Sequence, residues 1–189
     1  MTETLALSTL CENPLRPTGL STFFPAFVRE ARAQFPDIAW LVFVGPEASW
    51  PEGDPGVRVC RDFPSNERPA ARLRADHLAV AGAARKAGAK ALVTVGFHPL
   101  WDAGLPVAMQ VFSVPRFAGA SGLRERYRRW AVERGLGRSA LVIANSAWTA
   151  SRLPPARGPV LVSHEGLDRV RFTPDGPRGY PGVEGGIFY

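Results

Sequence analysis

The sequence has little cysteine and no long apolar run, and both shortages exclude classes of protein. Its two cysteines, Cys11 and Cys60, stand far apart without the spacing of metal ligands, so neither a zinc site nor a disulfide framework is predicted. No apolar run reaches the ~18 residues that a membrane-spanning helix needs. The N-terminus carries no signal-peptide pattern. We therefore expect a soluble, cytoplasmic protein.

Lysine is rare as well, and several nucleotide-binding and nucleic-acid-binding motifs are missing. The chain has two lysines, Lys86 and Lys90, and 21 arginines, and its formal net charge is +6. A basic surface suits phosphates or anionic lipid, although solvated surface charge is an equal alternative. Neither the dinucleotide-binding nor the P-loop glycine motif occurs. Without a helix-turn-helix, zinc-finger or RNA-binding motif, no nucleic-acid partner is expected.

What the sequence does contain is a series of apolar runs of strand length between amphipathic segments. A chain of 189 residues with 46% hydrophobic content fits one globular domain. Continuous apolar runs are typical of buried parallel strands, whose crossover connections are helices. The predicted fold is therefore doubly wound α/β, a mostly parallel sheet with helices on both faces. The strands are predicted at 5–10, 40–44, 57–60, 91–95, 107–111, 139–144 and 159–163.

Apolar residues at helical spacing predict the helices between these strands. The first helix follows Gly19 and is expected to have Ser21 or Thr22 near its N-cap, with Pro25 in its first turn. Ligands of such sheets bind beyond the carboxyl ends of the strands, so the residues that follow each strand are the first functional candidates. Further helices are predicted over 68–89, over 123–134 and, capped by Asn145 and Ser146, before Pro154.

The final third of the chain carries the most specific pattern. Residues 141–153 read LVIANSAWTASRL, and residues 160–174 read VLVSHEGLDRVRFTP. This pair resembles the family 4 glycosyltransferases, in which a strand and a Ser-led helix precede a strand that runs into Asn-Gly-Val-Asp-x-x-x-Phe-x-Pro. Glu165 stands where the family has Asn. The earlier elements agree in order and spacing, so the resemblance covers nearly the whole chain.

The resemblance implies a GT-B architecture, in which two Rossmann-like domains enclose the active site. Residues 1–178 would form the N-terminal, acceptor-side domain, and residues 179–189 the linker and truncated start of a C-terminal, donor-binding domain. It also implies a retaining, metal-independent transferase with a nucleotide-sugar donor, a glycan or lipid-linked acceptor and no cofactor. Donor and acceptor must be held together for transfer, so the isolated chain is expected to be inactive. The alternative is a stand-alone Rossmann-like binding or regulatory module.

The strand ends and the resemblance together select the candidate site residues. Relatives place His-Asp after the strand at 107–111, where this chain has Phe112 and Ser113. A glycine that opens a helix suits a phosphate, because free N–H groups point outward there. The structural alternatives are a packed histidine, a turn glycine and an arginine in a salt bridge. The predicted residues are catalytic His98 and Ser113, donor-binding Thr18, Gly19, Ser146 and Glu165, and acceptor-binding Asn66, Arg68 and Arg116, with no metal ligands.

The helix predicted at 123–134 has a strongly basic outer face. Such a face is commonly a solvated helix surface. The alternative is docking to an anionic membrane that carries a lipid-linked acceptor, at the inner face of the cell membrane. The residues of this basic face are Arg124, Arg126, Arg128, Arg129 and Arg134.

Overall fold

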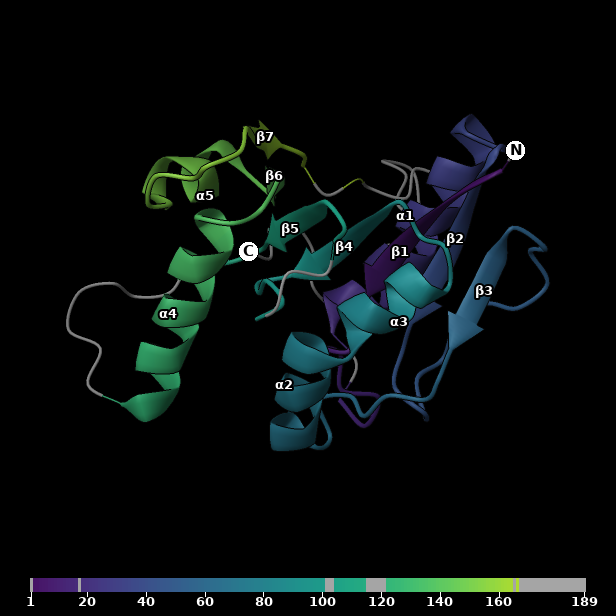
Figure 1. The fold of residues 1–189 in the computed structure, drawn as a ribbon, viewed down its shortest axis with the longest axis horizontal. Coiled ribbons are helices and arrows are strands. Elements are labelled where there is room, and N and C mark those ends of the chain that lie inside the picture. The colour runs from purple at the N-terminus through teal and green to yellow at the C-terminus, as the bar shows by residue number, and fades with distance from the viewer. Residues whose placement is uncertain (1, 17, 101–103, 115–121, 165, 167–189) are drawn as a thin grey trace, which may run out of the picture.

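Seven parallel strands form one sheet in this computed structural model (Figure 1). The structure describes residues 2–16, 18–100, 104–114, 122–164 and 166. The strands are β1 (Glu3–Ser8), β2 (Ile38–Phe43), β3 (Val57–Cys60), β4 (Ala91–Val95), β5 (Val107–Val111), β6 (Leu141–Ala144) and β7 (Val160–Val162). The helices are α1 (Gly19–Gln34), α2 (Pro69–Leu78), α3 (Val80–Lys86), α4 (Leu123–Leu136) and α5 (Ala147–Arg152).

The strand order is β3-β2-β1-β4-β5-β6-β7, and every neighbouring pair is parallel. The chain moves outward from β1 to β3, returns to place β4 on the other side of β1, and then moves outward again to β7. This is the Rossmann-like arrangement, so the predicted fold class is confirmed. The order reverses between β1 and β4, which is where such sheets bind their ligands.

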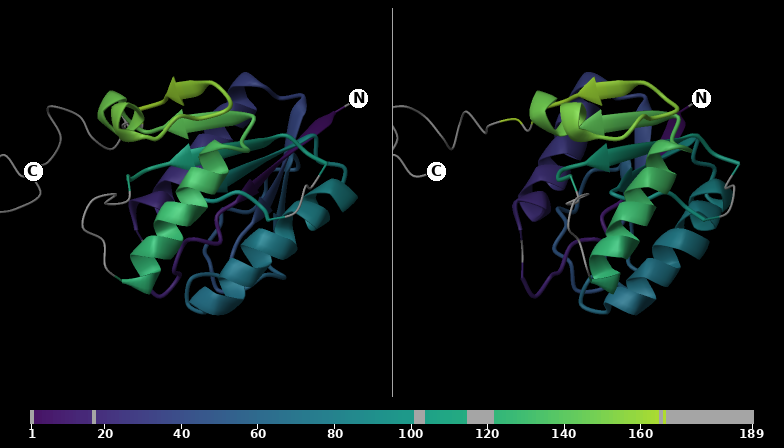
Figure 2. Two further views of the ribbon diagram at one scale, coloured as in Figure 1. Left: turned by 60° about the vertical axis from the view of Figure 1, so that its left-hand side comes forward. Right: turned by 90° about the vertical axis from the view of Figure 1, so that its left-hand side faces the viewer.

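Both faces of the central strands are covered by helices, as predicted. On one face, Phe24 of α1 packs in a cluster with Leu7 of β1. On the other face, Val80 of α3 packs in a cluster with Ala6 of β1. Successive residues of a strand point to opposite faces, which places the two clusters on opposite sides of the sheet. Figure 2 shows α4 beside α2, and Leu136 of α4 packs against the neighbouring strands β5 and β6.

The helix predicted over 68–89 is two helices, so the prediction of one continuous helix is wrong. α2 and α3 meet at Ala79, whose φ and ψ are −119° and −44°. Leu78 before the break is 48% exposed, whereas Val80 after it is fully buried. The change of direction carries Val80 and Ala84 onto the sheet. Burying this apolar surface outweighs the interrupted helical hydrogen bonding.

α1 begins at Gly19, one residue before the predicted apolar pattern starts at Leu20. Its N-cap is Thr18, whose Oγ1 accepts a hydrogen bond from the Leu20 N–H (3.2 Å), while Ser21 Oγ accepts one from the Thr18 N–H (3.1 Å). This reciprocal pair is a capping box. Ser21 lies near the N-cap, as the sequence predicts, and is the second residue of this capping box. Pro25 lies in the second turn rather than the first.

Several further predictions for the fold fall on residues that the structure describes, and one does not. α4 and β7 lie within two residues of their predicted ranges, and Ser146 caps α5 as expected. None of the helices in the described part of the chain is long and apolar enough to cross a membrane. The predicted linker and second-domain start at 179–189 lie outside the described residues.

Candidate functional site

The carboxyl ends of the strands meet along one edge of the sheet, which we call the carboxyl edge. Ser8 at the end of β1 is in register with Phe43 of β2, and Phe43 is in register with Cys60 of β3. Further along the sheet, Val111 of β5 is in register with Ala144 of β6. The loops that follow these strands therefore emerge at the same edge, and Thr18, Gly19, Asn66 and Ser146 lie on or just after them.

Glu12, in the loop after β1, holds this edge together. Its carboxylate is 8% exposed and accepts hydrogen bonds from Thr18 Oγ1 (3.1 Å) and from the Ser21 hydroxyl. Its main-chain carbonyl accepts a hydrogen bond from the Asn66 N–H (3.0 Å). Two predicted site residues, Thr18 and Asn66, thus bond to one residue, Thr18 to the carboxylate of Glu12 and Asn66 to its main-chain carbonyl. The negative charge of Glu12 also lies near the positive end of α1, which stabilises both.

Gly19, the first residue of α1, is exposed at this edge. A Cβ atom added there would meet nothing within 4 Å, and the φ angle of Gly19 is not in the left-handed region. Neither internal packing nor backbone conformation therefore requires a glycine. The absence of a side chain leaves the first turn of α1 open to close approach from outside.

A buried ion pair lies beneath the end of β1, on the side covered by α2. Asp76 is 1% exposed; its Oδ2 lies 3.2 Å from Arg72 Nε, and its Oδ1 accepts a hydrogen bond from Ser8 Oγ (3.3 Å). Burial raises the pKa of Asp76 to about 7, although Arg72 and the Ser8 hydrogen bond act to lower it. Burial also raises the pKa of the neighbouring Cys11 thiol to about 12. Asp76 is therefore a carboxyl that exchanges its proton near neutral pH.

His77, the next residue of α2, ties three segments together. Its Nδ1 lies 3.2 Å from the His98 carbonyl oxygen and must carry the proton, because a carbonyl can only accept. Its Nε2 then accepts a hydrogen bond from the Tyr127 hydroxyl of α4 (2.5 Å). Burial lowers the pKa of His77, with contributions from Arg72 and Arg134, and burial raises the pKa of Tyr127. A neutral histidine therefore joins α2, the loop after β4 and α4.

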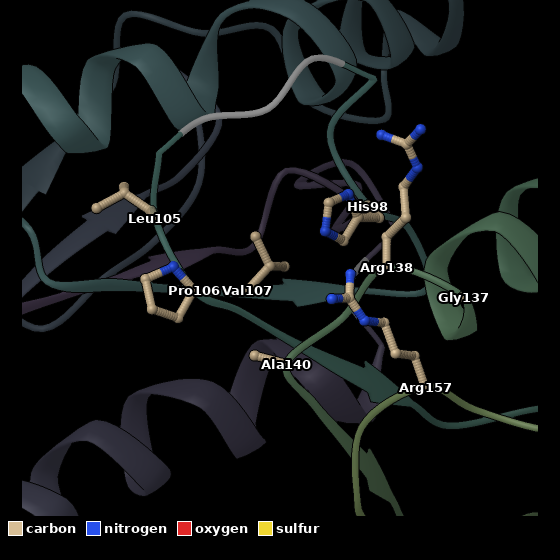
Figure 3. A pocket seen from close by; sticks show the side chains of 8 residues that line it. All are labelled: His98, Leu105, Pro106, Val107, Gly137, Arg138, Ala140 and Arg157. Carbon is tan, nitrogen blue, oxygen red and sulfur yellow. The ribbon is translucent and has the colours of Figure 1, made fainter.

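His98, a predicted catalytic residue, is buried rather than open. Its side chain is at the edge of a hollow that also includes Pro106 and Ala140, the residues just before β5 and β6. Its Cβ lies 3.8 Å from the position of an added Cβ at Gly135 in α4. The hollow is thus toward the amino ends of these strands. The hollow that His98 lines (Figure 3) therefore lies away from the carboxyl edge, where Thr18 and Gly19 are found.

Ser113, the other predicted catalytic residue, is exposed at the carboxyl edge. The preceding residue, Phe112, packs edge-to-face against Phe23 and Phe24 of α1, with ring centroids 5.6 and 6.0 Å apart. These contacts anchor the loop after β5 to the N-terminal half of α1. Ser113 therefore lies at the same end of the sheet as Gly19.

Of the remaining predicted site residues, Ser146 and Arg68 each lie at the N-cap position of a helix. The Ser146 hydroxyl accepts a hydrogen bond from the Thr149 N–H and donates one to Thr149 Oγ1, both 3.0 Å long. Arg68 is exposed at the N-cap position of α2, with no side-chain capping bond. Arg116 and Glu165 lie outside the described residues. Within the part of the chain that the structure describes, no group of three or more His, Cys, Asp or Glu residues is arranged to hold a metal ion.

The basic face of α4 is smaller than the sequence predicts. Arg134 does not belong to it, because its guanidinium donates a hydrogen bond to the Leu100 carbonyl (2.5 Å) and lies over the Trp130 ring at 5.8 Å. Arg126 and Arg128 are exposed on α4, and Arg128 pairs with Glu125 at 3.2 Å. The placement of Arg134 against the loop after β4 could not be read from helical spacing alone.

Comparison with known proteins supports the fold. No family model matches the chain, and no curated protein sequence matches it. Among solved structures, it is similar to UGT2 of Phytolacca americana, a glycosyltransferase of GT-B fold whose structure was determined with UDP-2-fluoro-glucose and pterostilbene. The TM-score is 0.52 at 12% sequence identity, over 84% of this chain. The chain shares the fold of this glycosyltransferase. It spans about half of that protein, 53% of its length.

Three residues of the site are missing from the sequence predictions: Glu12, Asp76 and His77. The ion pair of Asp76 has the i,i+4 spacing with Arg72 that brings two side chains together on a helix, so the sequence does contain a signal for it. Glu12 lies in an irregular loop, where no periodic pattern marks a buried carboxylate. His77 and Tyr127 are 50 positions apart, and only the packing of α2 beside α4 joins them.

Proposed function

We propose that the chain is the N-terminal, acceptor-side domain of a family 4 glycosyltransferase, which moves a sugar from a nucleotide-sugar donor to a glycan or lipid-linked acceptor. In this proposal the transferase is retaining and metal-independent, and it acts at the cytoplasmic side of the cell. A C-terminal domain of the same enzyme holds most of the donor, and the carboxyl edge of this chain contacts the donor's diphosphate. This chain then supplies only half of the catalytic unit.

The observation that carries the proposal is the match of 84% of this chain to about half of UGT2. That neighbour was solved with a nucleotide sugar, UDP-2-fluoro-glucose, and with a second compound, pterostilbene. The motif residues support the proposal independently, because 141–153 form a strand and a Ser146-capped helix, as the family pattern requires. The polar residues of the carboxyl edge lie where a Rossmann-like domain binds its ligands.

The residues of the carboxyl edge suit the work of an acceptor-side domain. The Glu12 carboxylate, oriented by Thr18 and Ser21, can accept a hydrogen bond from an acceptor hydroxyl. The first turn of α1 at Gly19 presents main-chain N–H groups to a departing diphosphate, and their dipole favours that charge. Transfer needs both substrates to be held in line. Groups from a second domain would complete that arrangement.

Titration of the chain with nucleotide sugars, monitored by the amide signals in NMR spectra, tests the proposal. We expect UDP-glucose or GDP-mannose to shift the signals of Thr18, Gly19 and Ser113. Gly19→Leu adds a side chain in open space, so it should leave the fold intact and weaken this binding by about tenfold or more. The matched control is Gly82→Leu, because an added Cβ at exposed Gly82 also meets nothing within 4 Å.

Two results would reject the proposal. One is that neither nucleotide sugar shifts the amide signals of the carboxyl edge. The other is that Gly19→Leu and Gly82→Leu weaken the binding of the nucleotide sugar equally. Either result would favour a stand-alone module. Transfer of radiolabelled sugar is measured in parallel, and the 189-residue chain is expected to show no turnover. Robust transfer by this chain alone would contradict the division of work between two domains.

The exposed face of α4 extends the proposal to an anionic membrane. Leu123 is 83% exposed and Trp130 43% exposed, and Arg126 and Arg128 are exposed on the same helix. Apolar and basic side chains together are typical of helices that lie on an anionic lipid surface. A lipid-linked acceptor would be reached from such a position.

Liposome sedimentation tests this membrane contact. We expect binding to vesicles with anionic lipid and weak binding to neutral vesicles. The double variant Arg126→Glu and Arg128→Glu should bind the anionic vesicles about tenfold or more weakly, because each basic residue contributes ~1 kcal/mol of attraction to such a surface. The control, Arg29→Glu with Arg74→Glu, makes the same change in charge at exposed positions on α1 and α2. Equal sedimentation with neutral and anionic lipid would exclude the contact.

A further inference from the structure

Helix α2 spans the point at which the strand order reverses, between β1 and β4. Asp76 of α2 accepts a hydrogen bond from Ser8, the last residue of β1 (3.3 Å). The next residue, His77, bonds to the His98 carbonyl oxygen in the loop after β4 (3.2 Å). Arg72 stands one turn of the helix before Asp76. Arg72 therefore lies on the helix that covers the crevice in which doubly wound sheets bind their ligands.

Arg72 belongs to the half of α2 that is nearer the carboxyl edge. The chain enters this helix through Asn66, whose N–H donates to the Glu12 carbonyl in the loop after β1 (3.0 Å). Arg68, the exposed N-cap residue, stands four positions before Arg72, so the two arginines share one face of the helix. Burial raises the pKa of the Cys11 thiol in the loop after β1, and the charge of Arg72 acts to lower it. Arg72 is therefore close to the loop after β1.

The guanidinium of Arg72 is held at one nitrogen and open at the other two. Its Nε is buried and lies 3.2 Å from Asp76 Oδ2, and the Arg72 side chain as a whole is 16% exposed. Within the residues that the structure describes, neither Nη1 nor Nη2 makes a hydrogen bond, and both retain contact with solvent. The ion pair with Asp76 therefore orients the side chain, while its two terminal nitrogens remain available to a ligand.

The charge of Arg72 is only partly balanced near neutral pH. It acts on the pKa of four side chains, which are Cys11, Asp76, His77 and Tyr127. Burial raises the pKa of Cys11 to about 12, raises that of Tyr127 and lowers that of His77, so these three groups are neutral. Burial raises the pKa of Asp76 to about 7, so its carboxyl carries roughly half a negative charge at neutral pH. A largely buried cation with an incomplete counter-charge is costly, and a bound anion would remove that cost.

Glu12 is a second acid near this point, but its carboxylate bonds to α1. It accepts hydrogen bonds from Thr18 Oγ1 and from the Ser21 hydroxyl. No ion pair joins Glu12 to Arg72 in the described part of the chain. A buried ion pair by itself adds little stability, because the cost of desolvation opposes the Coulombic attraction. Packing alone therefore gives a weak reason for a half-balanced arginine at this crevice, whereas an anionic ligand gives a strong one.

We propose that Arg72, oriented by Asp76, binds the anionic group of the acceptor, and that the acceptor is accordingly a sugar that carries a phosphate or a carboxylate. The inference rests on the function proposed above, because it assigns the ligand to the acceptor side. Nη1 and Nη2 together match the pair of oxygens that either anion presents, in two parallel hydrogen bonds. Asp76 is a positioning residue, which holds the guanidinium without touching the ligand.

Two acidic sugars and one uncharged sugar test the inference. Glucose 6-phosphate, glucuronate and glucose are titrated into the chain at about 0.15 M salt, where diffuse surface attraction is screened. The side-chain N–H signals of the arginines in NMR spectra report the contact directly. We expect saturable binding of at least one acidic sugar, with a shift of the Arg72 signals, and the sugar that binds identifies the anion. The inference is overturned if neither acidic sugar binds, if the Arg72 signals do not move, or if glucose binds equally well.

Variants separate the binding role of Arg72 from its role in the ion pair. Removing one partner of a buried pair is destabilising, so Arg72→Gln is made together with Asp76→Asn. Asp76→Asn alone should keep the binding of the acidic sugar, and adding Arg72→Gln should weaken it by about tenfold or more, since two charge-assisted contacts are lost. The control adds Arg74→Gln to Asp76→Asn, because Arg74 is exposed on the same helix. Thermal melting verifies that the variants fold, and equal weakening by the two arginine changes would overturn the inference.

The pH profile tests the positioning role of Asp76. As pH rises through about 7, Asp76 gains the charge that competes with the ligand for Arg72, so binding of the acidic sugar should weaken more in the wild-type chain than in Asp76→Asn. Equal profiles would contradict that role. The proposed function is tested separately by the response of Thr18 and Gly19 to nucleotide sugars. That response without binding of an acidic sugar overturns this inference alone, and the reverse outcome overturns the proposed function and leaves an acidic-sugar site.

Discussion

Leu92→Ala is expected to lower the free energy of unfolding by about 3 to 5 kcal/mol. Leu92 is fully buried in β4, and it packs in one cluster with Ala6 of β1, Leu41 of β2 and Val80 of α3. Removing its isobutyl group leaves a cavity between the sheet and α3, which the rigid neighbours cannot fill. For a domain whose whole stability is about 5 to 15 kcal/mol, this loss is a large fraction.

Urea unfolding of the wild-type chain and the variant measures this change. The control is Leu123→Ala, because Leu123 is 83% exposed and the same atoms are removed. We expect the control to change the free energy of unfolding by no more than about 0.5 kcal/mol. Similar losses in the two variants would contradict the position of β4 inside the sheet, with β1 on one side and β5 on the other.

Asp76 should make the protein less stable as the pH rises through neutrality. The pKa of its buried carboxyl is raised to about 7 from an ordinary value of 3.8. The folded state therefore binds this proton more tightly than the unfolded state. The stability that it contributes is complete below the ordinary pKa and is lost as pH rises from about 4 through about 7. His77, whose pKa is lowered, acts in the opposite direction and loses stability as pH falls below 6.5.

Asp76→Asn removes the titrating proton while keeping nearly the same shape. Between pH 5 and 8, we expect the wild-type chain to lose about 3 kcal/mol of stability relative to this variant. Urea unfolding at several pH values measures the difference, which separates Asp76 from the other titrating groups. Asp37→Asn is the control, because Asp37 is exposed, and its curve should run parallel to that of the wild type. Parallel curves for Asp76→Asn as well would show that Asp76 does not carry the effect.

The strands were accessible to prediction because their signal is local. Ranges 57–60, 91–95 and 107–111 coincide with β3, β4 and β5, since each is a short apolar run bounded by turn residues. The error in the helix predicted over 68–89 has a different origin. The break at Ala79 depends on where the sheet lies relative to α3, and helical spacing does not report that.

The candidate site was only partly accessible to prediction. Thr18, Gly19, Asn66 and Ser113 lie at the carboxyl edge because each follows a strand, and strand order along the chain places them there. The same reasoning does not place His98, which also follows a strand. Its chain turns back over the sheet toward α4, and a side chain's direction after a strand is set by the neighbours it packs against.

The amino-acid order alone is enough for the class of fold, because alternating apolar runs and amphipathic segments leave a parallel sheet as the stable way to bury them. The protonation of Asp76 and the hydrogen bonds to Glu12 are different. Each requires residues that are distant in the chain to come within a few ångströms. Burial and charge act over distances in space, so these properties come into existence only when the chain has packed.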